Sequence, residues 1–190
     1  MKIAVFGIGY VGLSNAVLLA QHNTVVAVDI CERRVAQINA RISPLEEVAL
    51  AEWLAEKPLR LRATTDAAQA IEDAEFIVIA TPTDYDPHTN FFDTSSVEQV
   101  IAQAVSENPN AQIVVRSTVP VGFVARMREI FSTEKILFCP EFLREGQALY
   151  DNLNPSRIVV GASTKQADQF AQLLVTGAKV TNVPLLFTGA

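Results

Sequence analysis

The sequence contains little cysteine, histidine or tryptophan, and this scarcity excludes several classes of protein. Two cysteines and two histidines among 190 residues match neither a disulfide framework nor the spacing of a zinc site, so we expect no metal. No apolar run approaches the roughly 20 residues that a transmembrane helix needs. Because a strand-like run begins at Lys2, we expect no signal peptide and a reducing, cytoplasmic location.

Positive charge is scarce as well. The chain has 15 Lys and Arg against 21 Asp and Glu, which gives a formal net charge of −6. This balance argues against binding to nucleic acid or to an anionic membrane, because both partners attract a basic surface. The hydrophobic fraction of 49% and the charged fraction of 19% are typical of an α/β protein, and the length suits one domain of generous size.

The first thirty residues contain the most informative pattern. A β-rich apolar run from Lys2 to Phe6 leads into G-x-G-x-x-G, an apolar stretch of helical length, and a second β-rich run that ends on an acid. This is the dinucleotide-binding fingerprint in its expected order. Its key residues are Gly7, Gly9, Gly12 and Asp29.

Each residue of the fingerprint has a physical task. Gly7 allows a tight turn, Gly9 lets the backbone approach a pyrophosphate, and Gly12 lets the helix pack against the strand. The start of the helix offers free N–H groups and a positive dipole end to phosphates, and Asp29 can accept hydrogen bonds from a ribose. Glycine alone also marks ordinary turns, but the flanking strands and the acid favour nucleotide binding.

Strand-like and helix-like segments alternate along the rest of the chain. Strands are predicted over residues 59–63, 75–80, 112–116, 135–139, 157–161 and 183–187, and helices over 32–42, 46–56, 65–71, 94–108, 165–175 and a segment ending at 131. The alternation implies right-handed βαβ units. We expect an α/β fold with a doubly wound, mostly parallel sheet, which forms a Rossmann-type domain over residues 1–190.

Ligands bind at the carboxyl ends of strands in such a sheet, so the segments that follow strands are candidate sites. Three stand out: TPT at 81–83, RSTVPVG at 116–122 and PEFLREG at 140–146. The first two also have plain structural interpretations, as a tight turn and as a helix cap formed by Ser117 or Thr118.

The third segment is rich in charge. Pro140 suits the first position of a helix, and a helical turn there places Glu141 and Glu145 on one face, where they can orient a polyol or activate a water. The alternative is a solvated turn neutralised by Arg144. Cys139, just before it, has no histidine nearby in sequence, so we interpret it, like Cys31, as a small buried hydrophobe.

In this order, the motifs GIGYVGL, ATPT, STVPVG, PEFLREG and SRIVVG resemble those of the nucleotide-sugar dehydrogenases, most of all the bacterial UDP-glucose 6-dehydrogenases. The resemblance covers essentially the whole chain, and PEFLREG after STVPVG is specific to this group. It implies an NAD-dependent, four-electron oxidation of UDP-glucose to UDP-glucuronate through a thiol adduct. For the full-length protein it also implies a homodimer.

The resemblance also implies roles for individual residues. Thr118 and Glu145 help to place the catalytic water, and Glu141 performs acid/base work. The implied cofactor-binding residues are Gly7, Gly9, Tyr10, Val11, Gly12, Asp29, Arg34, Thr83, Thr118 and Glu145. The implied sugar-binding residues are Glu141, Phe142, Leu143, Arg144 and Glu145, largely through the backbone of Phe142 and Leu143. Arg34 and Arg116 stand where lysine is common in the family, which keeps the charge but changes the donor geometry.

The family's thiol motif, G-x-C-L-P-K-D, and its catalytic lysine and asparagine do not occur in these 190 residues. The resemblance therefore implies the NAD-binding half, with the central helix and the C-terminal UDP-sugar domain outside the chain. The apolar run Leu185 to Phe187 at its end gives the same expectation of a longer protein. The alternatives are half of a GDP-mannose or UDP-N-acetylmannosamine dehydrogenase, or a non-catalytic NAD-binding module.

Overall fold

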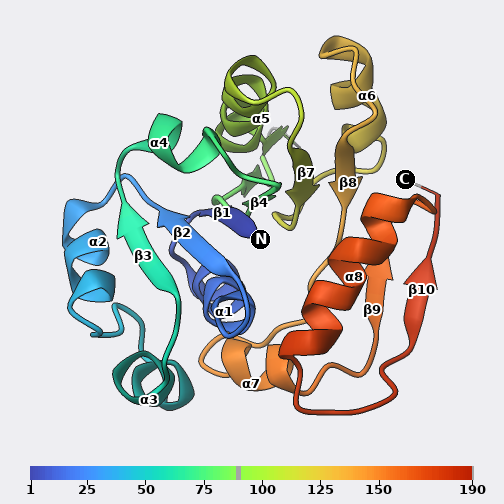
Figure 1. Cartoon of the computed structure of the whole chain (residues 1–190). Helices are drawn as coiled ribbons and strands as arrows, with labels where there is room; N and C mark the ends of the chain where they lie inside the picture. Colours follow the sequence, from blue (N-terminus) through green and yellow to red (C-terminus); the bar gives the residue numbers. More distant parts are fainter. Residues whose placement is uncertain (89–90, 190) are drawn as a thin grey trace.

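The computed structural model describes residues 1–88 and 91–189. Its centre is a six-stranded sheet with the order β3-β2-β1-β4-β7-β8 (Figure 1). All five strand pairings in this sheet are parallel. The strands are β1 (Lys2–Phe6), β2 (Thr24–Val28), β3 (Leu61–Thr64), β4 (Phe76–Ile79), β7 (Gln112–Val115) and β8 (Ile136–Phe138). The strand order reverses between β1 and β4, so the doubly wound Rossmann arrangement is confirmed.

Helices connect these strands and cover both faces of the sheet. They are α1 (Tyr10–Ala20), α2 (Glu32–Asn39), α3 (Val48–Glu56), α4 (Ala67–Ile71), α5 (Ser95–Glu107), α6 (Phe123–Ile130), α7 (Ala148–Leu153) and α8 (Lys165–Gly177). Two further strands, β9 (Ile158–Val160) and β10 (Leu185–Phe187), form a separate parallel pair. Figure 1 shows this pair with α8 beyond the β8 end of the central sheet. None of the described helices is long and apolar enough to cross a membrane.

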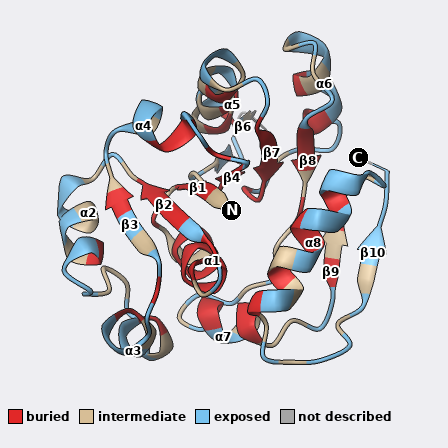
Figure 2. Cartoon of the chain, viewed as in Figure 1, coloured by how far each residue is buried: buried red, intermediate tan, exposed pale blue. Residues whose placement is uncertain are grey.

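Two apolar cores lie on opposite faces of the sheet, because alternate residues of a strand point to opposite sides. In β1, Ile3 and Val5 belong to the core that contains residues of α1, α3, α7 and α8. Ala4 and Phe6 belong to the other core, with residues of α4, α5 and α6. Figure 2 shows the central strands buried and the outer faces of the helices exposed. The near-continuous apolar strands of the sequence are therefore explained by burial on both faces.

Several predicted elements differ from the structure. The segment 84–93, for which neither a helix nor a strand was predicted, contains an antiparallel hairpin of β5 (Asp84–Asp86) and β6 (Phe91–Asp93), and residues 89 and 90 lie outside the described residues. Helix α2 ends at Asn39 rather than at 42, and Arg41 has a left-handed φ of 62°. Helix α7 was not predicted.

The helical turn considered as one possibility after Pro140 does not form. Residues 140–144 are irregular, and the helix begins only at Ala148. The carboxylate of Glu141 accepts the N–H of Leu143 at 2.8 Å, which is a local alternative to helical hydrogen bonds. Gly146 has a positive φ of 75°, which a helix interior does not allow. Glu141 and Glu145 therefore do not share a helical face.

Candidate functional site

A cleft of about 1010 Å³ opens along the carboxyl ends of the parallel strands. All three segments that follow strands and were chosen from the sequence contribute to its wall. The implied site residues that line it are Gly7, Gly9, Tyr10, Val11, Asp29, Arg34, Thr83, Thr118, Glu141, Leu143, Arg144 and Glu145. Gly12 and Phe142 do not line this cleft. The structure thus gathers most of the implied residues around one space, at the switch point between β1 and β4 where such folds bind ligands.

The three glycines of the loop after β1 differ in what surrounds them. Gly7 has a φ of +94°, and a Cβ atom there would lie 2.5 Å from the carbonyl oxygen of Ala80. At Gly12 a Cβ atom would lie 1.8 Å from the carbonyl oxygen of Gly7. At Gly9 a Cβ atom would meet nothing within 4 Å. The fold itself therefore requires the first and third glycines, whereas the second leaves free space in the cleft.

Helix α1 presents an uncompensated N-terminus to this cleft. Its N-cap is Gly9, which has no side chain to accept a hydrogen bond, and the first turn contains no acid. The N–H groups of the first turn and the positive end of the helix dipole are therefore available to an anionic ligand.

Asp29 is held rigidly at the end of β2. Its Oδ2 accepts the N–H of Ile8 at 2.7 Å, and its Oδ1 accepts the N–H of Cys31 at 2.9 Å. Nη1 of Arg34 lies 3.8 Å from Oδ2, and the Asp29 side chain is only 9% exposed. Because each carboxylate oxygen has a second lone pair, Asp29 can still accept a hydrogen bond from a hydroxyl in the cleft.

The two strand-end segments beyond β4 and β7 are joined by hydroxyl groups. Ser117 Oγ donates to the carbonyl oxygen of Thr81 at 2.7 Å, and Ser96 Oγ donates to that of Pro82 at 2.6 Å. The interpretation of Ser117 or Thr118 as a helix cap is wrong, because the N-cap of α6 is Gly122. Ser117 is used to hold the turn after β4, and Thr118 lines the cleft.

The loop that follows β8 is fixed by side chains at its far end. Arg144 binds Asp151 of α7 through two nitrogens, with Nη2 to Oδ1 at 2.6 Å and Nε to Oδ2 at 3.1 Å. These hydrogen bonds lower the pKa of Asp151 below its usual value. The resemblance implies that Arg144 binds the sugar. In the structure its guanidinium group is hydrogen-bonded to Asp151 of α7, although the residue also borders the cleft.

Glu47 is the residue that sequence reasoning missed. It is 5% exposed, and its two carboxylate oxygens accept the N–H groups of Ala148 and Leu149 at 3.0 and 2.8 Å. It thereby caps α7 from a position about a hundred residues earlier in the chain. No local pattern distinguishes Glu47 from its neighbour Glu46, so only the tertiary structure reveals the contact.

The two thiols lie in different surroundings. Cys139 is 1% exposed, and burial raises its pKa even though the charge of Arg116 acts in the opposite direction. This agrees with the interpretation of Cys139 as a small buried side chain. The same interpretation is wrong for Cys31, which is partly exposed and lines the cleft.

Comparison with known proteins identifies the family. The model of the UDP-glucose/GDP-mannose dehydrogenase family, NAD binding domain, matches residues 1–176. The chain belongs to this family. The matched model is that of an NAD-binding domain, so NAD is the cofactor that the family uses.

Individual relatives agree with this assignment. A UDP-glucose 6-dehydrogenase from Streptococcus pneumoniae is 51% identical over 192 residues, which cover 98% of this chain and 49% of the relative. One from Campylobacter jejuni is 40% identical, with coverage of 98% and 48%. Among solved structures, a GDP-mannose dehydrogenase from Pseudomonas aeruginosa superposes with a TM-score of 0.85 at 27% identity, and covers 100% of this chain and 46% of that one. A UDP-glucose dehydrogenase from Pyrobaculum islandicum superposes with a TM-score of 0.85 at 29% identity, and the match covers 98% of this chain and 46% of that one.

The chain thus spans about half the length of the relatives that it matches. It corresponds to the N-terminal, NAD-binding half of this family. The fold, the cofactor and the family predicted from the motifs are confirmed.

Proposed function

We propose that this chain is the cofactor half of a UDP-glucose 6-dehydrogenase, which converts UDP-glucose to UDP-glucuronate in two NAD-dependent oxidations. The proposal rests on one observation above all. A single cleft wall combines the glycine loop and Asp29 with Thr118, Glu141 and Glu145. The 51% identity to a UDP-glucose 6-dehydrogenase supports the choice of sugar.

In this proposal the glycine loop and α1 bind the pyrophosphate of NAD, with Tyr10 and Val11 beside it. Asp29 accepts hydrogen bonds from the adenosine ribose, and Arg34, 3.8 Å from it, holds that carboxylate in place. The remaining cofactor contacts are those of Thr83, Thr118 and Glu145, which border the same cleft. NAD, when bound, supplies the hydride acceptor.

The reacting end of the site lies at Thr118, Glu141 and Glu145. The hydroxyl of Thr118 and the carboxylate of Glu145 hold a water for the hydrolytic step, and Glu141 transfers a proton. One oxygen of Glu141 already accepts the N–H of Leu143, so only the other is free to act on a ligand. The backbone of Leu143 contacts the sugar, together with that of Phe142 beside it and with Arg144.

The thiol that carries the second oxidation lies, in this proposal, in the other half of the protein, with the central helix and the UDP-sugar domain. Residues 1–190 then form one NAD-binding domain of a cytoplasmic homodimer. Half of a GDP-mannose or UDP-N-acetylmannosamine dehydrogenase is the nearer alternative, because a GDP-mannose dehydrogenase superposes as well as a UDP-glucose dehydrogenase does. A non-catalytic NAD-binding module is the other.

The test measures two properties of the 190-residue chain. We expect calorimetry to show saturable NAD binding, and we expect no NADH to form when UDP-glucose is added. Positioning a substrate against a reactive group is worth roughly 7–11 kcal/mol of barrier, and only one wall of the sugar site is present here. Absence of NAD binding by folded protein contradicts the cofactor assignment. Sustained NADH formation contradicts the assignment of the thiol to the other half.

A further inference from the structure

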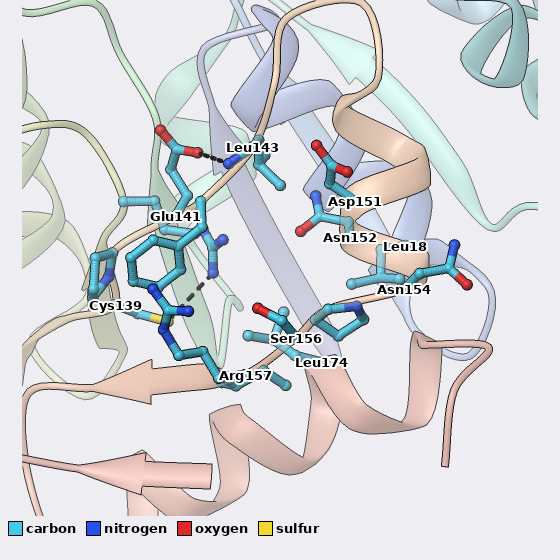
Figure 3. A pocket seen from close by; sticks show the side chains of 15 residues that line it. Leu18, Cys139, Glu141, Leu143, Asp151, Asn152, Asn154, Ser156, Arg157 and Leu174 are labelled. Carbon is cyan, nitrogen blue, oxygen red and sulfur yellow. Dashed lines mark hydrogen bonds between the residues drawn. The ribbon is translucent and has the colours of Figure 1, made fainter. Parts of the chain in front are cut away.

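A second, smaller cavity lies beside the cofactor cleft, under the loop that follows β8. It has a volume of about 170 Å³, and it is enclosed by this loop, α7 and the segment that leads into β9 (Figure 3). Arg116, Glu141 and Leu143 line both spaces. The cavity therefore adjoins the reacting end of the cleft.

Arg116 brings a positive charge into this wall with no anion to balance it. The residue is 5% exposed, and Nη1 donates to Cys139 Sγ at 3.3 Å. Its buried Nε has no hydrogen-bond partner, and Arg116 takes part in no ion pair among the residues that the structure describes. The thiol cannot supply the missing charge, because burial raises the pKa of Cys139 and keeps it protonated.

Arg157 contributes a second guanidinium to the same cavity. Its guanidinium carbon lies 4.1 Å from the centre of the Phe142 ring, and within residues 1–88 and 91–189 it forms no ion pair either. Figure 3 shows the Arg157 side chain extending from the segment before β9 toward the loop that contains Cys139 and Glu141. Two cations thus border one small space without a carboxylate partner.

The carboxylates in the wall, Asp151 and Glu141, form no ion pair with either of these arginines among the described residues. Both oxygens of Asp151 bind Arg144, at 2.6 and 3.1 Å. Oε2 of Glu141 accepts the N–H of Leu143. An uncompensated buried charge is strongly unfavourable, so the arrangement has the character of a site that is completed by a ligand.

We propose that this cavity binds one small oxyanion, a carboxylate or a phosphate group, between Arg116 and Arg157. The planar guanidinium fork matches both groups through paired hydrogen bonds. The volume of about 170 Å³ equals that of about six water molecules at the ~30 Å³ that each occupies in the liquid, which suits one such group and excludes a nucleotide. Inorganic phosphate and a sugar acid are the two sources; the second rests on the proposed function, because its product carries a new carboxylate.

The experiment follows the side-chain ¹⁵Nε–H resonance of Arg116 in the labelled chain. Phosphate is titrated against chloride at equal ionic strength, and glucuronate is titrated against glucose. Saturating NAD is present throughout, because phosphate also binds the free N-terminus of α1. We expect a saturable shift with phosphate, glucuronate or both, and none with chloride or glucose. The oxyanion that produces a saturable chemical-shift change identifies the source of the ligand.

Variants assign the effect to the cavity. Arg116→Met and Arg157→Gln should each weaken the oxyanion affinity at least tenfold, as followed by the rise in melting temperature that a ligand produces. The exposed Arg60→Met is the matched control and should leave the affinity unchanged. If Arg116→Met does not fold, Arg157→Gln still tests the site, because Arg157 is exposed.

The proposal is overturned if neither oxyanion exceeds its control, or if both arginine variants bind as well as the parent chain. The same samples report NAD binding separately. Failure to bind NAD therefore contradicts the proposed function without affecting the oxyanion result, and the reverse also holds.

Discussion

Two loops at the same edge of the sheet are built in opposite ways. The loop after β1 owes its shape mainly to close backbone contacts, with Gly7 in the left-handed region and packed against the Ala80 carbonyl, and Gly12 packed against the Gly7 carbonyl. The loop after β8 is shaped by side chains from elsewhere, with Glu47 capping α7 and Arg144 binding Asp151. Close backbone contacts therefore fix the first loop, whereas side chains from distant segments fix the second.

This difference follows the proposed division of work. A pyrophosphate group is the same in every dinucleotide, so a rigid backbone cradle serves for it. The sugar differs between members of the family, whose names include both UDP-glucose and GDP-mannose dehydrogenases. A loop held by exchangeable side chains can be repositioned without disturbing the cofactor site. If the two loops are separable in this way, a substitution that disturbs one loop should leave the other intact.

The largest effect is expected from Gly12→Ala. The added Cβ atom would lie 1.8 Å from a backbone oxygen, which cannot move without displacing β1, so we expect a loss of more than about 3 kcal/mol of stability. Thermal unfolding of the purified chain measures it. Gly9→Ala is the matched control, because its Cβ meets nothing within 4 Å; it should fold normally but bind NAD less tightly. Normal stability of Gly12→Ala would contradict the steric argument.

A smaller loss is expected from Glu47→Ala, which acts on the second loop. Two buried N–H groups of α7 lose their acceptor, at a cost of about 1–3 kcal/mol each, partly offset by water and by removal of a buried charge. We expect a net loss of about 2 kcal/mol, faster amide exchange at Ala148 and Leu149, and little change in the Kd for NAD.

The control for that variant is Glu52→Ala, an exposed acid on α3, which should stay within about 0.5 kcal/mol of the parent chain. A tenfold loss of NAD affinity in Glu47→Ala, with stability unchanged, would show that the two loops are coupled and the comparison is mistaken.

The same contrast explains how much the sequence could predict. The glycine loop was predicted correctly because its G-x-G-x-x-G pattern is contained in six consecutive residues, although the contact at Gly7 is with Ala80, which follows β4. For the loop after β8, the motif identified the segment that borders the cleft, but the sequence left open whether it forms a helical turn, and it does not. The competing hydrogen bond of Glu141 is local, yet the capping by Glu47 spans a hundred residues. Helix α7 was missed for the same reason, since its N-terminus is satisfied from outside.

A still smaller effect concerns the choice between NAD and NADP at Asp29. A 2′-phosphate adds a charge of about −1.5 to −2, and two unit charges ~4 Å apart repel by about 4 kcal/mol at an effective dielectric of ~20. Arg33 and Arg34 border the same cleft, and their positive charges reduce the repulsion between Asp29 and the 2′-phosphate. We expect NAD to bind at least about tenfold more tightly, or about 1.4 kcal/mol.

Asp29→Asn should reduce the difference in affinity between NAD and NADP, while the side chain still accepts the hydrogen bond from the Ile8 N–H. Calorimetric titration of both dinucleotides measures it, with Glu32→Gln, an exposed acid nearby, as the control. Equal or tighter binding of NADP to the parent chain would refute the role of Asp29.

The smallest effect is expected from Asp151→Asn, which removes the ion pair that holds the second loop to α7. The Arg144 side chain is 63% exposed, and exposed ion pairs contribute little to stability, so the melting temperature at pH 7 should fall by only about 1–3 °C.

The pKa of Asp151 is lowered in the folded chain, chiefly by its hydrogen bond with Arg144. A lowered pKa means that the stabilisation is present above the unfolded value of about 3.9 and disappears as the pH falls through the folded value. The difference in melting temperature between Asp151→Asn and the parent chain should therefore persist from pH 7 to pH 5 and disappear below pH 4. Asp168→Asn is the control, because Asp168 also lies in the first turn of a helix but has no arginine partner among the described residues. A difference in melting temperature that stays constant down to pH 3, or that Asp168→Asn reproduces, would show that the Arg144–Asp151 ion pair does not stabilise this loop.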